Sequence, residues 1–270
     1  MEKFVIFGNP VAHSKSPQMQ NAGFENLKYN GVYEKHHLDD GSTIKETFLK
    51  NNYKGANITV PHKEHAFKNA DEVRGLAKKI QAVNTYINEN GKVIAYNTDA
   101  PGFLKAIESF GEVRSVLLLG AGGTAKAIAL ALQESNIDVT VLNRSEGKLE
   151  FFKNENITCY SWDNFKSKKY DLIVNSTSAG LKDEYLPCDK ELLENVFKEA
   201  KYAFDCVYGK ITPFLSLAQK NGLEIKDGED MLLYQGALAF EYFTKQKVDE
   251  KVVEAMRDGL KATWEIAKVN

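Results

Sequence analysis

The sequence predicts an α/β protein of two domains, one of them with a doubly wound parallel sheet. An apolar run at residues 116–119 ends in a glycine turn at 120–123 and continues into a helix-forming stretch at 124–132. A second apolar run, residues 138–142, follows at the distance that a strand–helix–strand unit requires. The length of 270 residues exceeds that of a usual single core, so we expect a second domain beside this one.

The glycine turn has the pattern of a dinucleotide site. Gly120 and Gly122, with Ala125 in the third small position, fit the G-x-G-x-x-G/A fingerprint of Rossmann-like domains. Small residues let backbone N–H groups approach a pyrophosphate at the helix N-terminus. The alternative is close helix–strand packing without a ligand. The expected cofactor-binding residues of the turn are Gly120, Ala121, Gly122, Gly123, Thr124 and Ala125.

The end of the second apolar strand favours NADP over NAD. Asn143, Arg144 and Ser145 stand there, with Lys148 one turn on. An NAD site normally has a carboxylate at this point to accept from the ribose 2′-hydroxyl, whereas a guanidinium suits a 2′-phosphate. The alternative is an exposed arginine in a surface turn, with Glu146 as a nearby countercharge.

The composition excludes several other classes of protein. Hydrophobic residues make up 43% and charged residues 27%, and the net charge of −2 offers nucleic acid no basic surface. The longest apolar stretch is interrupted by Lys126, so we expect no membrane span. Cys159, Cys188 and Cys206 are odd in number and the histidines lack ligand spacing, so we expect neither disulfides nor a metal. A cytoplasmic location fits these features.

The N-terminal region begins with a strand and a polar loop. Residues 4–7 form the apolar run of that strand. Ser16 precedes Pro17 and has the form of the N-cap of a helix reaching about residue 27. Ser14 lies two residues earlier, at the carboxyl end of the strand, where α/β sheets bind ligands. We therefore regard Ser14 as a candidate binding residue.

Lys63 is a candidate functional lysine. Residues 31–37 alternate like a strand, 43–49 like a helix and 54–60 like a further strand, after which Pro61 begins another helix. Lys63 then lies in the first helical turn, where the macrodipole opposes a cation. Purely structural lysines usually avoid that position, although a solvated surface lysine balanced by Glu64 is the alternative.

Asp99 follows a predicted hairpin. Residues 82–87 and 92–96 flank an Asn-Gly turn. Asp99 precedes an amphipathic stretch at 103–110 and could be the N-cap of a helix. An N-cap also keeps a carboxylate ionised, which suits a partner for a catalytic ammonium.

Apolar strands recur at residues 157–160, 171–174 and 202–205, which is the doubly wound pattern. The loops at 175–180 and 205–209 follow two of these strands and could line the cofactor crevice, with Tyr208 offering a ring and a hydroxyl. Two helices, at 228–245 and 250–268, complete the chain. The Gln235 amide lies in an apolar stretch and needs hydrogen-bond partners there.

Seven motifs, in order and over nearly the whole chain, resemble the shikimate dehydrogenase family. They are Gly8-Asn9-Pro10 with 13–17, residues 57–63, Ala82-Val83-Asn84-Thr85, Asn97-Thr98-Asp99, residues 120–127, Asn143-Arg144-Ser145 and Tyr234-Gln235-Gly236-Ala237. Ala95 stands where the family more often has glycine, and Gly147 interrupts the basic segment after Arg144.

The resemblance implies a substrate-binding domain of residues 1–100 with 236–270 and an NADP-binding domain of residues 101–235. It also implies the reversible, NADP-dependent reduction of 3-dehydroshikimate to shikimate on the route to chorismate and the aromatic amino acids. Lys63 and Asp99 would be the catalytic pair. The implied substrate-binding residues are Ser14, Ser16, Asn57, Thr59, Lys63, Asn84, Asp99, Tyr208 and Gln235. The implied NADP-binding residues outside the glycine turn are Asn143, Arg144, Ser145, Lys148, Thr177, Val207, Gly228 and Met231.

These residue types suit the reaction, because hydride delivery to a carbonyl carbon creates an alkoxide that a cationic donor can stabilise and protonate. Two alternatives stay open. One is a quinate/shikimate dehydrogenase that uses NAD or NADP, and the other is a non-catalytic nucleotide-sensing protein on the same scaffold. The expected partner is a small molecule, and the chain is expected to be a monomer or a homodimer.

Overall fold

The computed structural model describes the backbone of residues 1–269 and the side chains of residues 1–261. The chain forms two compact units, Met1–Gly102 with Leu232–Asn270, and Phe103–Met231. Both are α/β, which confirms the predicted fold class. The boundaries, after Gly102 and after Met231, fall inside α5 (Asp99–Ile107) and α10 (Glu229–Thr244), two and four residues from the bounds expected from the sequence. A helix that continues through a boundary carries no change of pattern to mark it.

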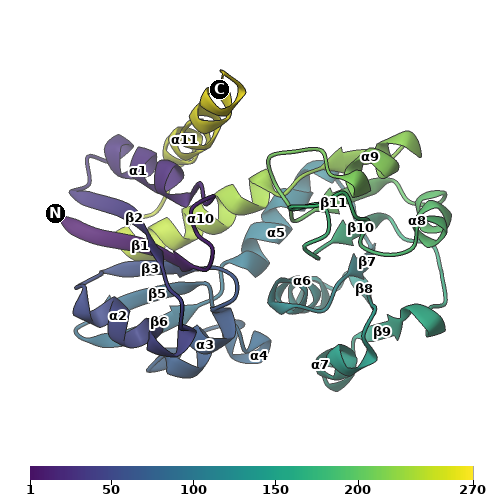
Figure 1. Ribbon diagram of the computed structural model, residues 1–270, viewed down its shortest axis with the longest axis horizontal. Coiled ribbons are helices and arrows are strands. Elements are labelled where there is room, and N and C mark those ends of the chain that lie inside the picture. Colours follow the sequence, from purple (N-terminus) through teal and green to yellow (C-terminus); the bar gives the residue numbers. More distant parts are fainter. Residues whose placement is uncertain (270) are drawn as a thin grey trace. The chain divides into compact units, whose positions relative to one another are not determined.

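The sheet of the first unit is mixed (Figure 1). Its strand order is β2-β1-β3-β5-β6-β4, and β5 runs antiparallel to both of its neighbours. The strands are β1 (Glu2–Gly8), β2 (Gly31–His37), β3 (Gly55–Ile58), β4 (Glu72–Val73), β5 (Thr85–Glu89) and β6 (Lys92–Tyr96). The other helices of this unit are α1 (Ser16–Asn26), α2 (Ile44–Lys50), α3 (Lys63–Asn69), α4 (Ala77–Ile80) and α11 (Glu250–Val269), with a 3-10 turn at Gly41–Thr43.

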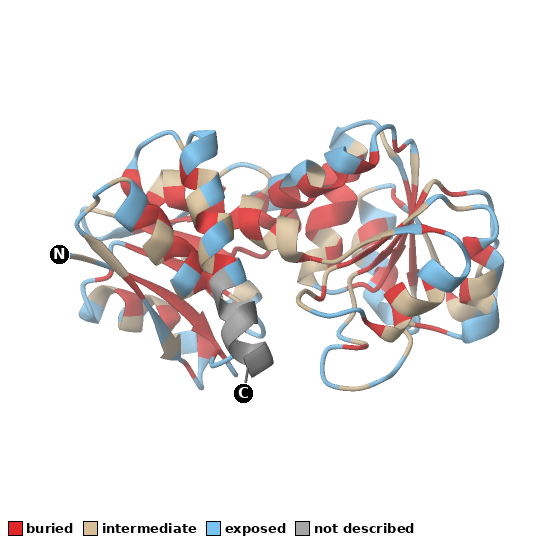
Figure 2. Ribbon diagram, turned by 90° about the horizontal axis from the view of Figure 1, so that it is seen from above, coloured by how far each residue is buried: buried red, intermediate tan, exposed pale blue. Residues whose placement is uncertain are grey.

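Strand β1 is buried on both faces, which explains its unbroken apolar run. Phe4 and Ile6 pack into one core with residues of α1, α10 and α11. Val5 and Phe7 point to the opposite core, which contains residues of α2 and α3. Alternate side chains of a strand face opposite sides of its sheet, so a strand covered by helices on both sides is apolar throughout. Figure 2 shows buried residues following the strands of the sheet.

The sheet of the second unit is parallel, in the order β12-β11-β10-β7-β8-β9. The strand order reverses at β7, which is where doubly wound sheets bind ligands. The strands are β7 (Ser115–Leu119), β8 (Asp138–Asn143), β9 (Thr158–Ser161), β10 (Leu172–Asn175), β11 (Tyr202–Asp205) and β12 (Glu224–Lys226). The helices are α6 (Gly123–Glu134), α7 (Glu150–Asn154), α8 (Lys190–Phe197) and α9 (Pro213–Lys220), with 3-10 turns at Glu108–Phe110, Glu146–Leu149 and Trp162–Asn164.

Three helices begin at other residues than the sequence predicted. Ser16 is the first residue of α1 and not its N-cap, because Ser14 Oγ accepts from Ser16 N at 3.3 Å. Asp99 is likewise the first residue of α5, because Asn97 Oδ1 accepts from Asp99 N at 3.0 Å. Pro61 lies in a turn before α3, since His62 N donates to Thr59 O at 3.0 Å. In each case an earlier oxygen accepts the first free N–H.

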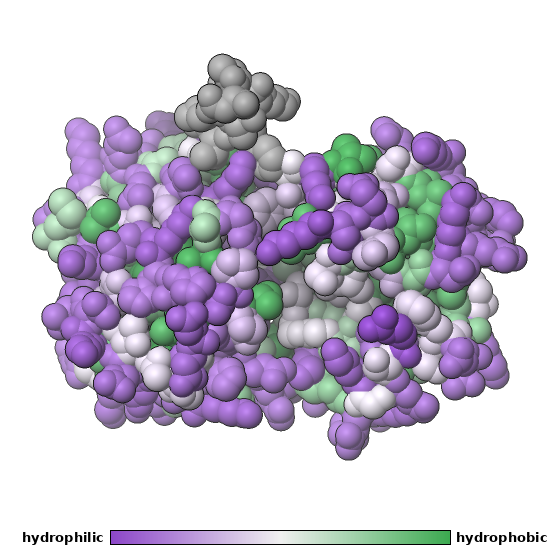
Figure 3. Space-filling view, viewed as in Figure 1, coloured by the Kyte–Doolittle hydropathy of each residue, from purple (hydrophilic) through white to green (hydrophobic). Residues whose placement is uncertain are grey.

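The face of the molecule in Figure 3 is mainly hydrophilic, with hydrophobic residues in small groups. Among the described residues, no helix combines the length and the hydropathy needed to span a membrane.

Candidate active site

The sheet of the first unit brings its polar side chains to one edge. Strands β1, β3 and β6 run in the same direction because the antiparallel β5 lies between β3 and β6. Ser14, Lys63 and Asp99 follow the carboxyl ends of these three strands, and Asn84 precedes the amino end of β5 at the same edge. Residues far apart in the sequence are therefore neighbours.

Lys63 and Asp99 form a partly buried ion pair. Lys63 Nζ donates to Asp99 Oδ2 at 2.6 Å, and their side chains are 16% and 10% exposed. Each is the first residue of its helix, so the dipole of α5 favours the carboxylate while that of α3 opposes the ammonium. The Asp99 carboxylate therefore compensates the charge of the Lys63 ammonium, which the dipole of α3 does not favour. An ammonium held in this way keeps donors for a further oxygen.

Asn84 connects this pair to Gln235. Asn84 Nδ2 donates to Asp99 Oδ1 at 2.9 Å and to Gln235 Oε1 at 3.2 Å. Gln235 Nε2 in turn donates to Leu232 O at 2.8 Å, which supplies the partners that an amide in an apolar helix requires. Asn84 is 2% exposed and Gln235 8% exposed. The structure thus brings four of the predicted site residues into one network.

Asn57 is held beside this network by three bonds. Its Nδ2 donates to Asn84 O and to Thr85 Oγ1, each at 3.2 Å. Tyr33 Oη donates to Asn57 Oδ1 at 2.7 Å, and burial raises the pKa of this phenol well above its usual range. The hydroxyl is therefore a fixed donor, which sets the orientation of the Asn57 amide.

Of the remaining polar residues predicted in this unit, Ser14 and Thr59 lie in the loops after β1 and β3, and Ser16 begins α1. Ser14 Oγ donates to Ser16 Oγ at 3.3 Å, and both residues are buried. Thr59 N donates to Phe7 O at 2.9 Å, which ties the loop after β3 to β1. Helix α1, which carries Ser16, contacts α10 one residue beyond Gln235, since Gln20 Nε2 donates to Gly236 O at 3.0 Å.

The sequence prediction missed Thr98 as a site residue. Thr98 N donates to Asn84 Oδ1 at 2.8 Å, and Thr98 Oγ1 donates to Gln235 Oε1 at 3.2 Å. Thr98 is fully buried. The signal available in the sequence was a polar residue between Asn97 and Asp99 at the end of an apolar strand. Thr98 fixes the amides of Asn84 and Gln235, from which the network is built.

The glycine turn of the second unit has the geometry of a phosphate cradle. Gly120 has φ +110°, in the region that favours glycine, and a Cβ there would lie 2.9 Å from Ser176 Oγ. Gly122 is the N-cap of α6, and a Cβ there would meet nothing within 4 Å. Ala125 is fully buried. The open space therefore lies at the helix N-terminus, where backbone N–H groups favour an anion.

The basic cap of β8 is exposed. Arg144, Ser145 and Lys148 are on the surface, and Asn143 Nδ2 donates to Ser145 O at 2.9 Å to close the turn. Within the described part of the chain Arg144 makes no ion pair, whereas Glu146 pairs with Lys153 at 3.4 Å. The nearby carboxylate thus has another partner, and the guanidinium is available to a ligand.

Two loops carry the remaining predicted cofactor residues. Thr177 follows β10, and its N and Oγ1 donate to Asn175 Oδ1 at 3.0 and 2.7 Å. Val207 follows β11, and its carbonyl accepts from Gly228 N at 3.1 Å. Burial raises the pKa of the Tyr208 phenol, and Met231 is 7% exposed.

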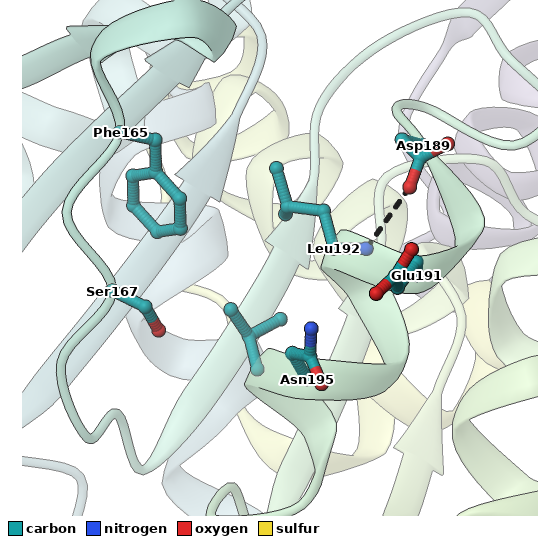
Figure 4. A pocket seen from close by; sticks show the side chains of 7 residues that line it. Phe165, Ser167, Asp189, Glu191, Leu192 and Asn195 are labelled. Carbon is teal, nitrogen blue, oxygen red and sulfur yellow. Dashed lines mark hydrogen bonds between the residues drawn. The ribbon is translucent and has the colours of Figure 1, made fainter.

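A shallow depression elsewhere on the second unit contains none of the predicted residues (Figure 4). Its bond between Asp189 Oδ1 and Leu192 N, at 3.1 Å, is the N-cap of α8 and needs no ligand to explain it. Among the described residues no cluster of three or more His, Cys, Asp or Glu side chains could hold a metal ion. The lining of the depression in Figure 4 includes Phe165, Ser167, Asp189, Glu191, Leu192 and Asn195.

Two family models match the chain. The model described as the shikimate dehydrogenase substrate binding domain matches residues 6–86. The model described as the shikimate 5′-dehydrogenase C-terminal domain matches residues 228–257.

Full-length relatives and solved structures agree with these matches. The chain is 46% identical over 256 residues to a shikimate dehydrogenase (NADP(+)) of Helicobacter hepaticus, covering 94% of this chain and 95% of the relative. It is 45% identical to the Helicobacter pylori protein of the same name, covering 95% and 98%. A shikimate 5-dehydrogenase from Thermus thermophilus, solved with NADP(H) and shikimate, superposes with a TM-score of 0.86 at 33% identity, covering 97% and 99%.

Proposed function

The chain belongs to the shikimate dehydrogenase family, and on that premise we propose that it catalyses the reversible, NADP-dependent reduction of 3-dehydroshikimate to shikimate. The relatives named above are NADP-dependent shikimate dehydrogenases, and one was solved with both NADP(H) and shikimate. The observation that carries the proposal to residues is the 2.6 Å bond between Lys63 and Asp99, which Asn84 extends to Gln235. A non-catalytic nucleotide sensor needs no such pair.

Lys63 is the proton donor for reduction. When hydride reaches the carbonyl carbon, negative charge develops on the oxygen, and an ammonium at hydrogen-bond distance stabilises that charge and supplies the proton. Asp99 holds Lys63 through Oδ2 and accepts from Asn84 through Oδ1, so it keeps capacity for a substrate hydroxyl. In the reverse direction Lys63 takes the proton back from the hydroxyl group.

Neutral side chains recognise the rest of the substrate. The hydroxyl and carboxylate groups of shikimate need several donors and acceptors in fixed positions, because a site built to bond a hydroxyl rejects analogues that lack it. The buried network around Asn84 has this character, since its amides are already oriented by protein bonds. The residues that we assign to substrate binding beside the catalytic pair are Ser14, Ser16, Asn57, Thr59, Asn84, Tyr208 and Gln235.

The second unit supplies the residues that would hold NADP. The open space at Gly122 and the N-terminus of α6 fit a pyrophosphate, and the exposed Arg144 and Lys148 fit a 2′-phosphate. The bound cofactor supplies the hydride in the direction of reduction. The residues that we assign to it are Gly120, Ala121, Gly122, Gly123, Thr124, Ala125, Asn143, Arg144, Ser145, Lys148, Thr177, Val207, Gly228 and Met231.

One absorbance assay tests the proposal. The purified protein with shikimate and NADP should form NADPH, with a much lower rate on quinate and with NAD. Equal rates on quinate, or with NAD, would instead favour the broader quinate/shikimate dehydrogenase. Absence of turnover with both acids and both nicotinamides would contradict the assignment as an enzyme of this class.

Two further parts of the proposal concern the protein in the cell. We propose a cytoplasmic location, supported by three cysteines of which none is in a disulfide. We propose that the chain acts as a monomer or a homodimer, which sedimentation at micromolar concentration would decide.

A further inference from the structure

Asp205 is a fully buried carboxylate that the reaction does not use. It ends β11, and its oxygens accept from three groups. Asn175 Nδ2 lies 3.1 Å from each oxygen, Val207 N lies 2.9 Å from Oδ1, and Thr212 Oγ1 lies 2.6 Å from Oδ2. These donors come from the end of β10, the loop after β11 and the N-cap of α9. One side chain thus joins three segments.

This carboxylate is held at a cost. Burial raises the pKa of Asp205 to about 6, although the bonds from Thr212, Val207 and Asn175 lower it. Its three donors are a hydroxyl, a backbone N–H and an amide, and the nearby Asp227 raises the pKa further. Burial of a charge without a countercharge is unfavourable, so stability alone does not explain a carboxylate at this position.

The carboxylate determines how Asn175 is oriented. An ionised carboxylate accepts hydrogen bonds and donates none, so the Asn175 amide must turn its NH₂ group toward Asp205. Asn175 Oδ1 then faces Thr177 and accepts from its N and Oγ1 at 3.0 and 2.7 Å. Through Asn175, Asp205 therefore also fixes the loop that carries Thr177.

A second branch runs to Val207. Its N–H donates to Asp205, and its carbonyl accepts from Gly228 N at 3.1 Å. Asp227 continues this connection, because its Oδ2 accepts from Gly209 N at 2.8 Å and its Oδ1 from Glu229 N at 3.1 Å. The loop after β11 is therefore fixed from Asp205 to the start of α10, which carries Met231.

We propose that Asp205 is a positioning residue for NADP: its carboxylate holds the two loops that present Thr177 and Val207 to the cofactor. The inference rests on the proposed function, because that function places these loops in the cofactor site. Asp205 touches neither substrate nor cofactor and acts through Asn175 and the backbone of Val207.

A swap of the two side chains tests the proposal. In Asp205→Asn the Asn175 NH₂ group faces one carbonyl oxygen and one NH₂ group where it faced two oxygens, and in Asn175→Asp two carboxylates lie 3.1 Å apart. The double variant again places an NH₂ donor against a carboxylate. We expect each single variant to raise KM for NADPH about tenfold, and the double variant to return it to within about threefold of the wild type. KM for 3-dehydroshikimate should change less than about twofold in all three.

Asp171 provides a matched control in the same sheet. It directly precedes β10, at the amino ends of the strands, whereas Asp205 lies at the carboxyl end of β11. Asp171 also joins three segments, because it accepts from Arg114 N at 3.0 Å and Ser115 Oγ at 3.3 Å and pairs with Lys201 at 3.3 Å. Asp171→Asn should lower the melting temperature without raising KM for NADPH. An equal rise in KM in Asp171→Asn and Asp205→Asn would mean that general loosening is the cause, and would overturn the proposal.

A second measurement does not depend on activity. Amide hydrogen exchange at residues 175–179 and 206–209 should be faster in Asp205→Asn than in the wild type and slow again in the double variant. Unchanged exchange, or unchanged KM for NADPH in an active enzyme, would overturn the role of Asp205. If the exchange rates of the variants differ as expected but the wild type shows no activity, the result would contradict the proposed function alone. If Asp205→Asn does not fold, Thr212→Val should raise KM and Thr212→Ser should not, and equal values would overturn the proposal.

Discussion

The substrate site and the cofactor site are built from different parts of the chain. In the first unit, side chains make the site, and Lys63, Asn84, Asp99 and Gln235 are bonded to one another before any ligand is present. In the second unit, the glycine turn offers backbone N–H groups and open space, and Arg144 is exposed. A small polyhydroxy acid is distinguished by the placement of a few hydroxyl groups, which demands fixed partners. A dinucleotide carries charged phosphates that backbone and exposed cations can bind.

The two units also stabilise their buried carboxylates differently. Asp99 is paired with the Lys63 ammonium, whereas the donors to Asp205 are a neutral amide, a hydroxyl and a backbone N–H. A carboxylate beside a cation stabilises the charged form of both groups. A carboxylate among neutral donors fixes the directions of their hydrogen bonds. The variants below separate these two uses, beginning with the largest expected effect.

Lys63→Ala should break the substrate site most severely. Loss of the ammonium removes a group needed most in the transition state, so we expect kcat to fall by at least about 10²-fold while KM changes less than about threefold. Steady-state rates with NADPH measure this effect. Lys68→Ala is the matched control, because Lys68 is an exposed lysine in the last turn of the same helix, and it should leave both constants unchanged. A Lys63→Ala enzyme with normal turnover would remove the lysine from the mechanism.

Most elements of the fold could be predicted from the sequence, because they carry a strong period or a clear cap. The strand at Tyr202–Asp205 was predicted at the residues where it occurs. Strands β4 and β12, of two and three residues, were not predicted, because so short a segment has no period to detect. Three helices start at other residues than expected, because an oxygen of Ser14, Asn97 or Thr59 accepts from the backbone N–H two or three residues further on.

The candidate site was predicted by residue type more than by geometry. Lys63 and Asp99 were expected to pair only through the family resemblance, since 36 residues separate them and the pairing of β3, β5 and β6 is non-local. Thr98 and Asp205 were missed as site residues for a related reason. Their importance depends on amides that reach them from elsewhere in the fold, Asn84 for Thr98 and Asn175 for Asp205.

The pH dependence of stability should distinguish the carboxylate with neutral partners. Because the pKa of Asp205 is about 6 in the folded protein against an ordinary 3.8, its contribution to stability is present below about pH 4 and is lost as the pH rises through 6. From pH 4.5 to 7.5 the free energy of unfolding of the wild type, relative to Asp205→Asn, should fall by about 2 kcal/mol. Urea denaturation at several pH values measures this difference. Asp227 is present in both proteins, so its own titration contributes to both curves.

Asp171 gives the opposite sign in the same experiment. Burial raises its pKa, but the bonds from Arg114 and Lys201 outweigh burial and leave the pKa below its ordinary value. Its contribution to stability is therefore present above the unfolded pKa and is lost as the pH falls through the folded one. The wild type should accordingly lose stability relative to Asp171→Asn on acidification. The same sign for both residues would show that our account of Asp205 is wrong.

Arg144→Ala should weaken the cofactor site for one nicotinamide only. A charge-assisted bond to the 2′-phosphate is lost, so we expect KM for NADPH to rise about tenfold and KM for NADH to stay within about twofold. Lys153→Ala removes a neighbouring cation that is paired with Glu146, and it should change neither value. Equal losses with both nicotinamides would contradict the assignment of Arg144 to the phosphate.

Gly122→Ala should have the smallest effect and tests the use of backbone in the cofactor site. Gly122 has φ −83° and ψ −175°, which alanine adopts, and its Cβ would meet no atom within 4 Å, so the free energy of unfolding should change by less than about 1 kcal/mol. The added methyl group nevertheless occupies the space that a pyrophosphate needs. We expect KM to rise about fivefold for NADPH and NADH alike, because both carry that group. Gly147→Ala, also in open space, should raise neither, and an unchanged KM in Gly122→Ala would mean that the phosphates bind elsewhere.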